Sequence, residues 1–600
     1  MRDFLKQTLA TLLALFIFLG VSVGGLLLLL ISLSMLASRD TTPTVRDKSV
    51  LVFDMSQTIT DAPASSSTRD VLNDAISGSR PNTVSLRSVL NSIEEAAKDN
   101  RVVGIYLNGG DGSSTTGYAT LREVRQALER FKASGKKIFA YDVDWQEREY
   151  YLGSIADTIA VNPVGSVELN GLSSEGLYFA RALQKFGIGF QVTRVGKFKS
   201  AVEPFLQNRR SAADRQQTRK LLSDIWTEFL STTGKSRNLA PKQLQAIADR
   251  SGQVEPQDAV KAKLVDRVAY VDEMTAELKK LTGQDDDTRS FRQVSLKTYA
   301  QVAENKRDSK TSRNQIAVVY AEGQIVNGQG GAGQIGGDRL AKQLRDLRFD
   351  DDVKAVVLRV NSPGGSATAS EIIQREAILT NQKKPVIVSM GNVAASGGYW
   401  ISTYASEIFA EPTTITGSIG VFGGLPNIQQ IANQNGFNWD VVKTARFADS
   451  RTISRPKTPE ELKIIQTSVD RIYDQFLTKV ADSRKLEKAK VAEIAQGRVW
   501  SGNQAKSIGL VDQIGGLEDA IRAAAERAKL GNDWQIDEYP KPRSFEERLI
   551  ETLTGAMVTE PAIDPITSEI KKVQAQLESL KAMNDPHGIY LRMPFDLSIR

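Results

Sequence analysis

The sequence has no cysteine and only one histidine among its 600 residues. Without cysteine, disulfides, thiol nucleophiles and thiolate metal sites are all excluded. A Ser-His-Asp triad or a histidine-based zinc site would depend on His587, which lies 13 residues from the C-terminus between a proline and a glycine. We interpret His587 as a tail residue, so hydrolytic chemistry needs lysine or a carboxylate as its base. We expect neither a metal nor an organic cofactor.

Charge of neither sign dominates the chain. Lys and Arg number 77 against 71 Asp and Glu, which leaves +6, and the two signs are interspersed. A nucleic-acid-binding protein typically gathers its basic residues into a stripe or patch, so nucleic acid is not an expected partner. The proportions of hydrophobic (41%) and charged (25%) residues are those of a folded globular protein. Because a single core stops growing near ~250–300 residues, the length predicts several domains.

The N-terminus carries an uncharged, mostly apolar run of 32 residues from Gln7 to Ser38. A membrane-spanning helix needs ~20 apolar residues, whereas a signal peptide has an apolar region of ~7–15 residues and an A-x-A-like cleavage site. We predict an uncleaved N-terminal transmembrane helix within residues 1–47, with cleavage near Ser32-Leu33-Ser34 as the alternative. Basic residues flank both ends, so their count does not fix the orientation. The short charged head resembles a signal-anchor, which predicts that the bulk of the chain lies outside the cytoplasm.

The chain contains an internal repeat. Residues 102–266 align with residues 353–512, and five positions share one offset of 249. These are Tyr150-Tyr151 with Tyr399-Trp400, Ile159 with Ile408, Pro163 with Pro412, Gly187 with Gly436, and Phe198 with Phe447. Chance matches would not keep one offset over so long a stretch, so we predict two copies of one domain.

Each copy alternates predicted strands with predicted helices. The second copy has apolar runs at 353–360 and 385–390, typical of buried strands, and an amphipathic helical pattern at 367–381 between them. The first copy shows the same order with strands at 102–108 and 137–143 and a helix at 120–131. This alternation predicts an α/β fold with parallel strand pairing.

The repeat also sets the expected domain limits. We assign residues 48–282 to the first copy and 315–540 to the second. Residues 283–314 are expected to link the copies, although 294–303 is apolar enough to pack on one of them. Residues 541–600 form a C-terminal extension with one predicted helix, because its apolar residues are spaced 4, 3, 4 and 3 apart: Ile566, Ile570, Val573, Leu577 and Leu580.

Two loops of the second copy are candidates for catalysis. Ser396 follows a strand, and Gly397 and Gly398 lead from it into a helix whose free N–H groups can stabilise a developing negative charge. The preceding strand ends in Asn361-Ser362-Pro363-Gly364-Gly365, where the glycines can offer further N–H donors. Loops after neighbouring parallel strands meet at one edge of a sheet. Taken alone, a helix-capping serine and a Pro-Gly turn are equally good interpretations.

The two copies differ where chemistry is expected. The first copy has Glu147 opposite Ser396, and its Lys199 lies opposite Ala448 of the second copy. One copy therefore holds the serine and the other the lysine. Lys197 competes with Lys199, because positions two apart share a face of an extended segment. A lysine base must be desolvated, and lowering its pKa from ~10.4 to ~8 costs roughly 3 kcal/mol.

Four motifs in order resemble the long form of the signal peptide peptidase family, also called protease IV. They are VGKFKSAVEPF (195–205), VNSPGGSATASE (360–371), AASGGYWIS (394–402) and TGSIGVF (416–422). The resemblance covers most of the chain and implies two tandem ClpP/crotonase-like α/β domains and a Ser/Lys dyad. It implies Ser396 as nucleophile, Lys199 as general base, Ser418 as the residue that orients the lysine, and Gly364 and Gly397 as oxyanion N–H donors.

The resemblance also implies what the protein acts on. We expect a membrane-anchored serine endopeptidase that degrades cleaved signal peptides and other apolar peptides, assembled as a homo-oligomer, a tetramer in this family. Its catalytic bulk is expected on the periplasmic side of a bacterial inner membrane. Two alternatives remain: a crotonase-like acyl-CoA enzyme, because fold does not fix function, and a non-catalytic membrane scaffold.

Overall fold

The computed structural model describes residues 44–63, 83–110, 114–285, 289–308, 312–541 and 589–593, together with Gln7, Ala14 and Phe18. The chain divides into two units, Met1–Val45 and Arg46–Arg600, and every element below belongs to the second. All but three positions of the apolar run 7–38, which is predicted to form the membrane anchor, lie outside the described residues. The whole apolar stripe of the C-terminal helix and His587 also lie outside them. Among the residues described, no helix combines the length and apolarity needed to cross a membrane.

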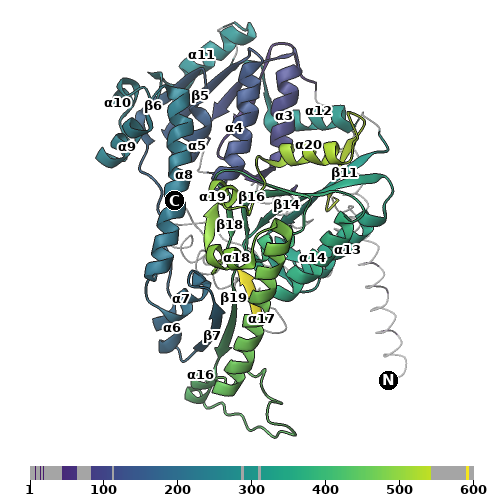
Figure 1. Cartoon of the computed structure of the whole chain (residues 1–600). Coiled ribbons are helices and arrows are strands. Elements are labelled where there is room, and N and C mark those ends of the chain that lie inside the picture. The colour runs from purple at the N-terminus through teal and green to yellow at the C-terminus, as the bar shows by residue number, and fades with distance from the viewer. Residues whose placement is uncertain are drawn as a thin grey trace. The chain divides into compact units, whose positions relative to one another are not determined.

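The first repeat is built on a seven-stranded sheet in the order β10-β1-β4-β5-β6-β8, with β9 also paired to β6. Its pairs are parallel except that of β6 with β8. The strands are β1 (Ser49–Asp54), β4 (Val102–Asn108), β5 (Lys137–Trp145), β6 (Thr158–Glu168), β8 (Gln253–Val254), β9 (Arg267–Val268) and β10 (Gln293–Ser295). Helices α3 (Leu86–Lys98) and α4 (Tyr118–Ala133) pack side by side on this sheet (Figure 1).

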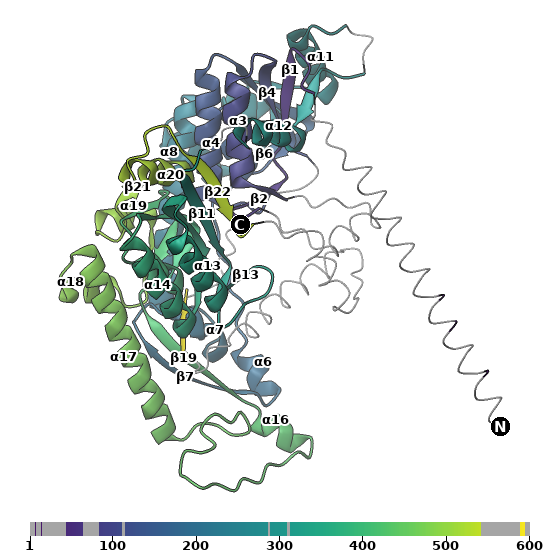
Figure 2. The same ribbon diagram turned by 90° about the vertical axis from the view of Figure 1, so that its right-hand side faces the viewer.

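The second repeat has an eight-stranded sheet in the order β20-β18-β16-β14-β11-β22, extended by β17 and β21. The strands are β11 (Gln315–Glu322), β14 (Val353–Ser362), β16 (Val386–Ala395), β17 (Glu407–Ala410), β18 (Ile415–Gly417), β20 (Val499–Ser501), β21 (Gln513–Ile514) and β22 (Gln535–Tyr539). Helices α13 (Gly337–Phe349) and α14 (Ala367–Asn381) lie together on one face (Figure 2). The mixed α/β fold with mainly parallel pairing is therefore confirmed.

Matching hydrogen bonds confirm the internal repeat. Tyr150 Oη donates to the carbonyl of Leu264 at 2.7 Å, and Tyr399 Oη donates to that of Leu510 at 2.8 Å. The N–H of Ile159 donates to Asp266, as that of Ile408 does to Asp512, both at 2.8 Å. The long helices α8 (Ala212–Arg237) and α17 (Pro459–Arg484) both have 26 residues, and each ends at a residue with φ 53°.

A third sheet joins the repeats, in the order β13-β12-β15-β23-β19-β7. Its strands are β7 (Gly189–Val195), β12 (Gln324–Val326), β13 (Gln334–Gly336), β15 (Gly364–Ser366), β19 (Val421–Asn427) and β23 (Ile589–Arg592). Strand β7 belongs to the first repeat and pairs antiparallel with β19 of the second over seven residues. Because of this pairing, the segment that follows β7, which contains Lys197 and Lys199, lies beside the second repeat.

The segment expected to link the repeats also contributes to the core. Strand β10 lies in residues 283–314 and pairs parallel with β1. Helix α12 (Leu296–Asp308) then packs on α3, with Leu296, Tyr299 and Ala303 buried. The apolar residues of this segment are thus placed on the first repeat.

Candidate active site

Ser396 stands between the end of β16 and the start of α15 (Gly397–Ser402), in a conformation that few non-glycine residues adopt. Its φ is 55° and its ψ is −111°. Bonds on both sides hold it there: its N–H donates to Gly417 O and its carbonyl accepts from Trp400 N–H, both at 2.8 Å. Strained backbone of this kind persists only where the surroundings enforce it, and it clusters at functional sites.

Lys199 brings its side-chain nitrogen to this serine from the other repeat. Its Nζ lies 2.7 Å from Ser396 Oγ, 3.0 Å from Ser418 Oγ and 3.1 Å from Ser418 O. Ser418 follows β18 with φ 50°, and its N–H donates to Arg498 O at 2.7 Å. The three side chains meet although 197 residues separate Lys199 from Ser396.

The lysine is completely buried, with 0% of its surface exposed. Two glycines make this possible: a Cβ on Gly497 would lie 2.7 Å from Lys199 N, and one on Gly420 would lie 3.2 Å from Lys199 Cδ. Burial lowers the pKa of Lys199 well below its ordinary value, because desolvation disfavours the ammonium form. The neutral amine that a general base requires is therefore accessible nearer neutral pH.

The structure separates the two candidate lysines. Lys197 is exposed, with its Nζ 5.5 Å from the centre of the Phe198 ring, whereas Lys199 points to the serine. A polar network that the sequence did not reveal holds this segment. Ser200 Oγ donates to Asp214 Oδ1 at 2.6 Å, and Gln217 Nε2 donates to Phe198 O at 3.0 Å. The sequence offers one sign of this network: Asp214 and Gln217 are three residues apart on α8, a spacing that places two side chains on the same face of a helix.

The two glycines predicted as oxyanion donors lie against each other. Gly364 has φ 95°, and a Cβ there would lie 2.6 Å from Gly397 N. The space beside Gly397 N therefore depends on glycine at position 364. The N–H of Gly364 donates to Ser362 Oγ at 3.2 Å, a long bond that an oxyanion would have to replace. All five predicted site residues thus come together, while their chemical roles remain predictions.

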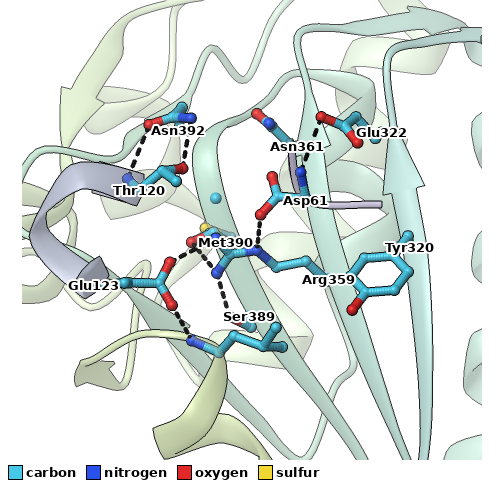
Figure 3. A network of polar contacts seen from close by, with 12 residues as sticks. Asp61, Thr120, Glu123, Tyr320, Glu322, Arg359, Asn361, Ser389, Met390 and Asn392 are labelled. Atoms are coloured by element: carbon cyan, nitrogen blue, oxygen red, sulfur yellow. Dashed lines mark hydrogen bonds and ion pairs between the residues drawn. The ribbon is translucent and has the colours of Figure 1, made fainter. Parts of the chain in front are cut away.

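A buried ion cluster joins the repeats at the strand that carries Ser362 (Figure 3). Arg359 on β14, 0% exposed, donates through Nε to Asp61 Oδ1 at 2.7 Å and through Nη2 to Glu123 Oε1 at 2.6 Å. Both carboxylates come from the first repeat. Burial raises the pKa of Glu123, and Arg359 opposes that rise. A fully buried guanidinium needs such partners, so the cluster fixes the register between the repeats.

A second contact between the repeats lies on the strand leading to Ser396. Asn392 on β16 donates through Nδ2 to Thr120 Oγ1 at 2.8 Å and accepts from Thr120 N–H at 3.2 Å (Figure 3). A Cβ on Gly117 would lie 2.3 Å from the Asn392 amide oxygen, so the Asn392 side chain packs directly against the backbone of Gly117. In the described part of the chain, no three His, Asp or Glu side chains group to hold a metal ion.

Comparison with known proteins adds independent evidence. The model of peptidase family S49 matches residues 130–285 and again 378–531, one match in each repeat. Protease 4 of Salmonella typhi is 37% identical over 565 residues, which is 90% of each chain. Protease 4 of Haemophilus influenzae is 34% identical over 87% of each chain. The chloroplastic serine protease SPPA of Arabidopsis thaliana is 33% identical over 77% of this chain and 68% of its own.

These matches define the chain as a serine peptidase. It belongs to peptidase family S49, in its tandem-repeat form. A solved structure of a ClpP1 mutant from Listeria monocytogenes covers 37% of this chain and 99% of its own, at 16% identity and a TM-score of 0.24. A TM-score this low does not establish a shared fold, so the ClpP/crotonase-like assignment remains a prediction.

Proposed function

We propose that the protein is a membrane-anchored serine endopeptidase in which Ser396 is the nucleophile and Lys199 the general base. The observation that carries this proposal is the 2.7 Å contact between Lys199 Nζ and Ser396 Oγ, made by a lysine that is fully buried. A desolvated lysine with a lowered pKa is the form that can accept a hydroxyl proton.

The proposed reaction has two stages. Neutral Lys199 takes the proton of Ser396 as Oγ attacks the peptide carbonyl, and it then gives that proton to the leaving amine. A water molecule, deprotonated by the same lysine, attacks the acyl-enzyme, and the lysine returns the proton to Ser396 Oγ as the bond between Oγ and the acyl carbon breaks and the second product leaves. Ser418 Oγ, 3.0 Å from Nζ, would keep the amine directed at Ser396.

The negative charge that develops on the carbonyl oxygen also needs donors. We assign this role to the N–H groups of Gly364 and Gly397, whose backbones approach each other beside Ser396. Removing one such donor typically costs ~10²–10³ in kcat. Replacing Gly364 by alanine would also strain its φ of 95° and place a Cβ 2.6 Å from Gly397 N.

The proposed substrates are cleaved signal peptides and other apolar peptides. A protein of Enterococcus faecium named as a putative signal peptide peptidase is 34% identical over 43% of this chain. Residues 7–38 would form the anchor, with the catalytic bulk on the periplasmic side of a bacterial inner membrane. The homo-oligomer, a tetramer, belongs to the same proposal.

The test is hydrolysis of an apolar signal-peptide-like substrate by the full chain in detergent micelles, between about pH 6 and pH 10. Ser396→Ala and Lys199→Ala should each lower kcat/KM by at least ~10³, and the double variant should lose no more than either one. Lys197→Ala, the matched lysine control, should keep the wild-type rate. Equal activity in Ser396→Ala and wild type would refute the nucleophile assignment. Loss in Lys197→Ala instead of Lys199→Ala would refute the choice of base.

A further inference from the structure

The side chain of Gln217 on α8 contacts both repeats. Its Nε2 donates to the carbonyl of Phe198, the residue before Lys199, at 3.0 Å, and to Ser200 Oγ at 3.1 Å. Its Oε1 accepts from the N–H of Val499 on β20 at 3.3 Å. Gln217 is 1% exposed, so protein groups rather than solvent surround its amide. One buried amide therefore joins the lysine segment of the first repeat to a strand of the second.

The strand that Gln217 reaches also holds Ser418. Val499 pairs with Gly417 where β20 runs beside β18, and the N–H of Ser418 donates to the carbonyl of Arg498 at 2.7 Å. Ser418 Oγ in turn lies 3.0 Å from the lysine nitrogen. The amide of Gln217 is thus bonded at one end to the backbone of the base and at the other to the backbone beside the residue proposed to orient that base.

Asp214, one turn before Gln217 on α8, fixes the direction of the amide. Its Oδ1 accepts from Ser200 Oγ at 2.6 Å and from Gln217 Nε2 at 3.1 Å, and its Oδ2 accepts from Arg210 at 2.7 Å. Asp214 is 2% exposed, and a buried carboxylate requires partners of this kind. Because an ionised carboxylate only accepts hydrogen bonds, Nε2 of Gln217 faces Asp214 and Oε1 faces Val499.

A lysine base needs support for its backbone, because its long, flexible side chain loses much rotamer freedom when it is held in one place. Lys199 has to bring Nζ within hydrogen-bond distance of Ser396 and Ser418, which both belong to the other repeat. The second repeat supports the segment from its own side, where the N–H of Phe198 donates to Gln496 O at 2.8 Å. Loss of the support on the α8 side would let the segment move and admit water to the amine.

We propose that Gln217 is a positioning residue for the base, whose amide holds the Lys199 segment of the first repeat in register with the Ser418 strand of the second. This inference rests on the proposed function, in which Lys199 is the base. The position requires one neutral group that both donates and accepts, which an amide provides and a carboxylate or a thioether does not. Gln217 is too deeply buried to touch a substrate, so its loss should act on kcat rather than on KM.

The test is Gln217→Met in the full-length chain, which removes the hydrogen bonds and nearly keeps the side-chain volume. At about pH 7, kcat for an apolar peptide should fall at least ~10-fold, while KM changes less than ~2-fold. Water admitted to the amine raises the pKa of Lys199 back toward its ordinary value, so the rise of kcat/KM should move to higher pH and the deficit should shrink there. The charged groups around the segment, Asp214, Arg210 and Arg498, stay in place in this variant.

Gln245→Met on α9 (Pro241–Arg250) is the matched control. Gln245 Oε1 accepts from Trp226 Nε1 of α8 at 2.7 Å, so the same substitution removes a hydrogen bond to the same helix, one that does not involve residues 196–200. It should keep the wild-type kcat and pH profile. Ser200→Ala removes only the hydroxyl between Gln217 and Asp214. It should shift the profile in the same direction as Gln217→Met, by less, and covers the case in which Gln217→Met does not fold.

A double variant separates positioning from a merely structural role. Added to Lys199→Ala, Gln217→Met should cause no further loss of the residual rate, because Gln217 acts through the lysine. A further loss, an unchanged pH profile in Gln217→Met, or the same shift in Gln245→Met would overturn the proposal. If Ser396→Ala and Lys199→Ala lose activity while Gln217→Met does not, only the role of Gln217 fails. Wild-type rates in Ser396→Ala and Lys199→Ala would overturn the proposed function, and the role of Gln217 with it.

Discussion

Replacing Ser418 by alanine gives a sharp test of how the lysine is tuned. Ser418 Oγ accepts a hydrogen bond from Lys199 Nζ at 3.0 Å. Hydrogen bonds to charged groups contribute ~1.5–3 kcal/mol, against ~0.5–1.5 for neutral ones, so this bond favours the ammonium over the amine by about 1.4 kcal/mol. Burial already lowers the pKa of Lys199, and losing the acceptor should lower it further, by about one unit at ~1.36 kcal/mol per unit.

The assay is the pH dependence of kcat/KM for peptide hydrolysis. Activity requires the neutral amine, so the rate rises with pH through the pKa of Lys199, and in Ser418→Ala this rise should move to lower pH by about one unit. The plateau should also fall, by about tenfold or more, because the amine is held less well toward Ser396. The control is Ser92→Ala, at a buried serine of α3 whose Oγ donates to Ser88 O in the same helix. An unchanged midpoint, or one that moves to higher pH, would contradict this account of the site.

Three further predictions follow from the packing around the lysine and between the repeats. Gly497→Ala should abolish most activity by displacing Lys199. Gly531→Ala should not, because Gly531 also has a positive φ but has nothing within 4 Å of its Cβ position. Initial rates of peptide hydrolysis by the two variants are the measurement. Arg359→Met should cost about 3–5 kcal/mol, seen as a lower thermal unfolding midpoint, because Asp61 and Glu123 stay buried without their partner; adding Asp61→Asn and Glu123→Gln should recover part of the loss. Moving the lysine, as Lys199→Ala with Ala448→Lys, should not restore hydrolysis near neutral pH, because position 448 is exposed and a lysine there stays protonated.

Much of the fold could be predicted because its elements are long and periodic. The helix expected at 367–381 has the bounds of α14, and the strand expected at 102–108 has those of β4. The internal alignment paired the repeats correctly, since the equivalent tyrosines, 249 residues apart, and the equivalent aspartates, 246 residues apart, make equivalent hydrogen bonds. The periodic helices and strands follow local patterns that a sequence displays directly.

Which distant segments contact each other across the two repeats could not be predicted from the sequence pattern. Alternation could not separate Lys197 from Lys199, because the deciding factor is the approach of Gly497 from 298 residues away. The third sheet draws β7, β15, β19 and β23 from four separate regions, and no periodicity predicts which short strands will pair. The ion cluster of Arg359 was missed for the same reason, since a lone arginine in an apolar strand gives no sign of its carboxylates.

The division of the site between repeats has a physical reason. A lysine base must be buried, but a buried ammonium is costly, so the position has to be closed by a surface from elsewhere in the fold. Lys199 meets that condition because β7 pairs with β19 and the backbone at Gly497 closes over it. The equivalent Ala448 lies in an exposed segment, where a lysine would keep nearly its ordinary pKa. Opposite Ser396, Glu147 accepts hydrogen bonds from the N–H groups of Asn170 and Gly171 and leaves no nucleophile there. In the proposed mechanism the first repeat therefore supplies the buried lysine and the second supplies the serine. The buried contacts of Arg359 and Asn392 join the two repeats beside this site.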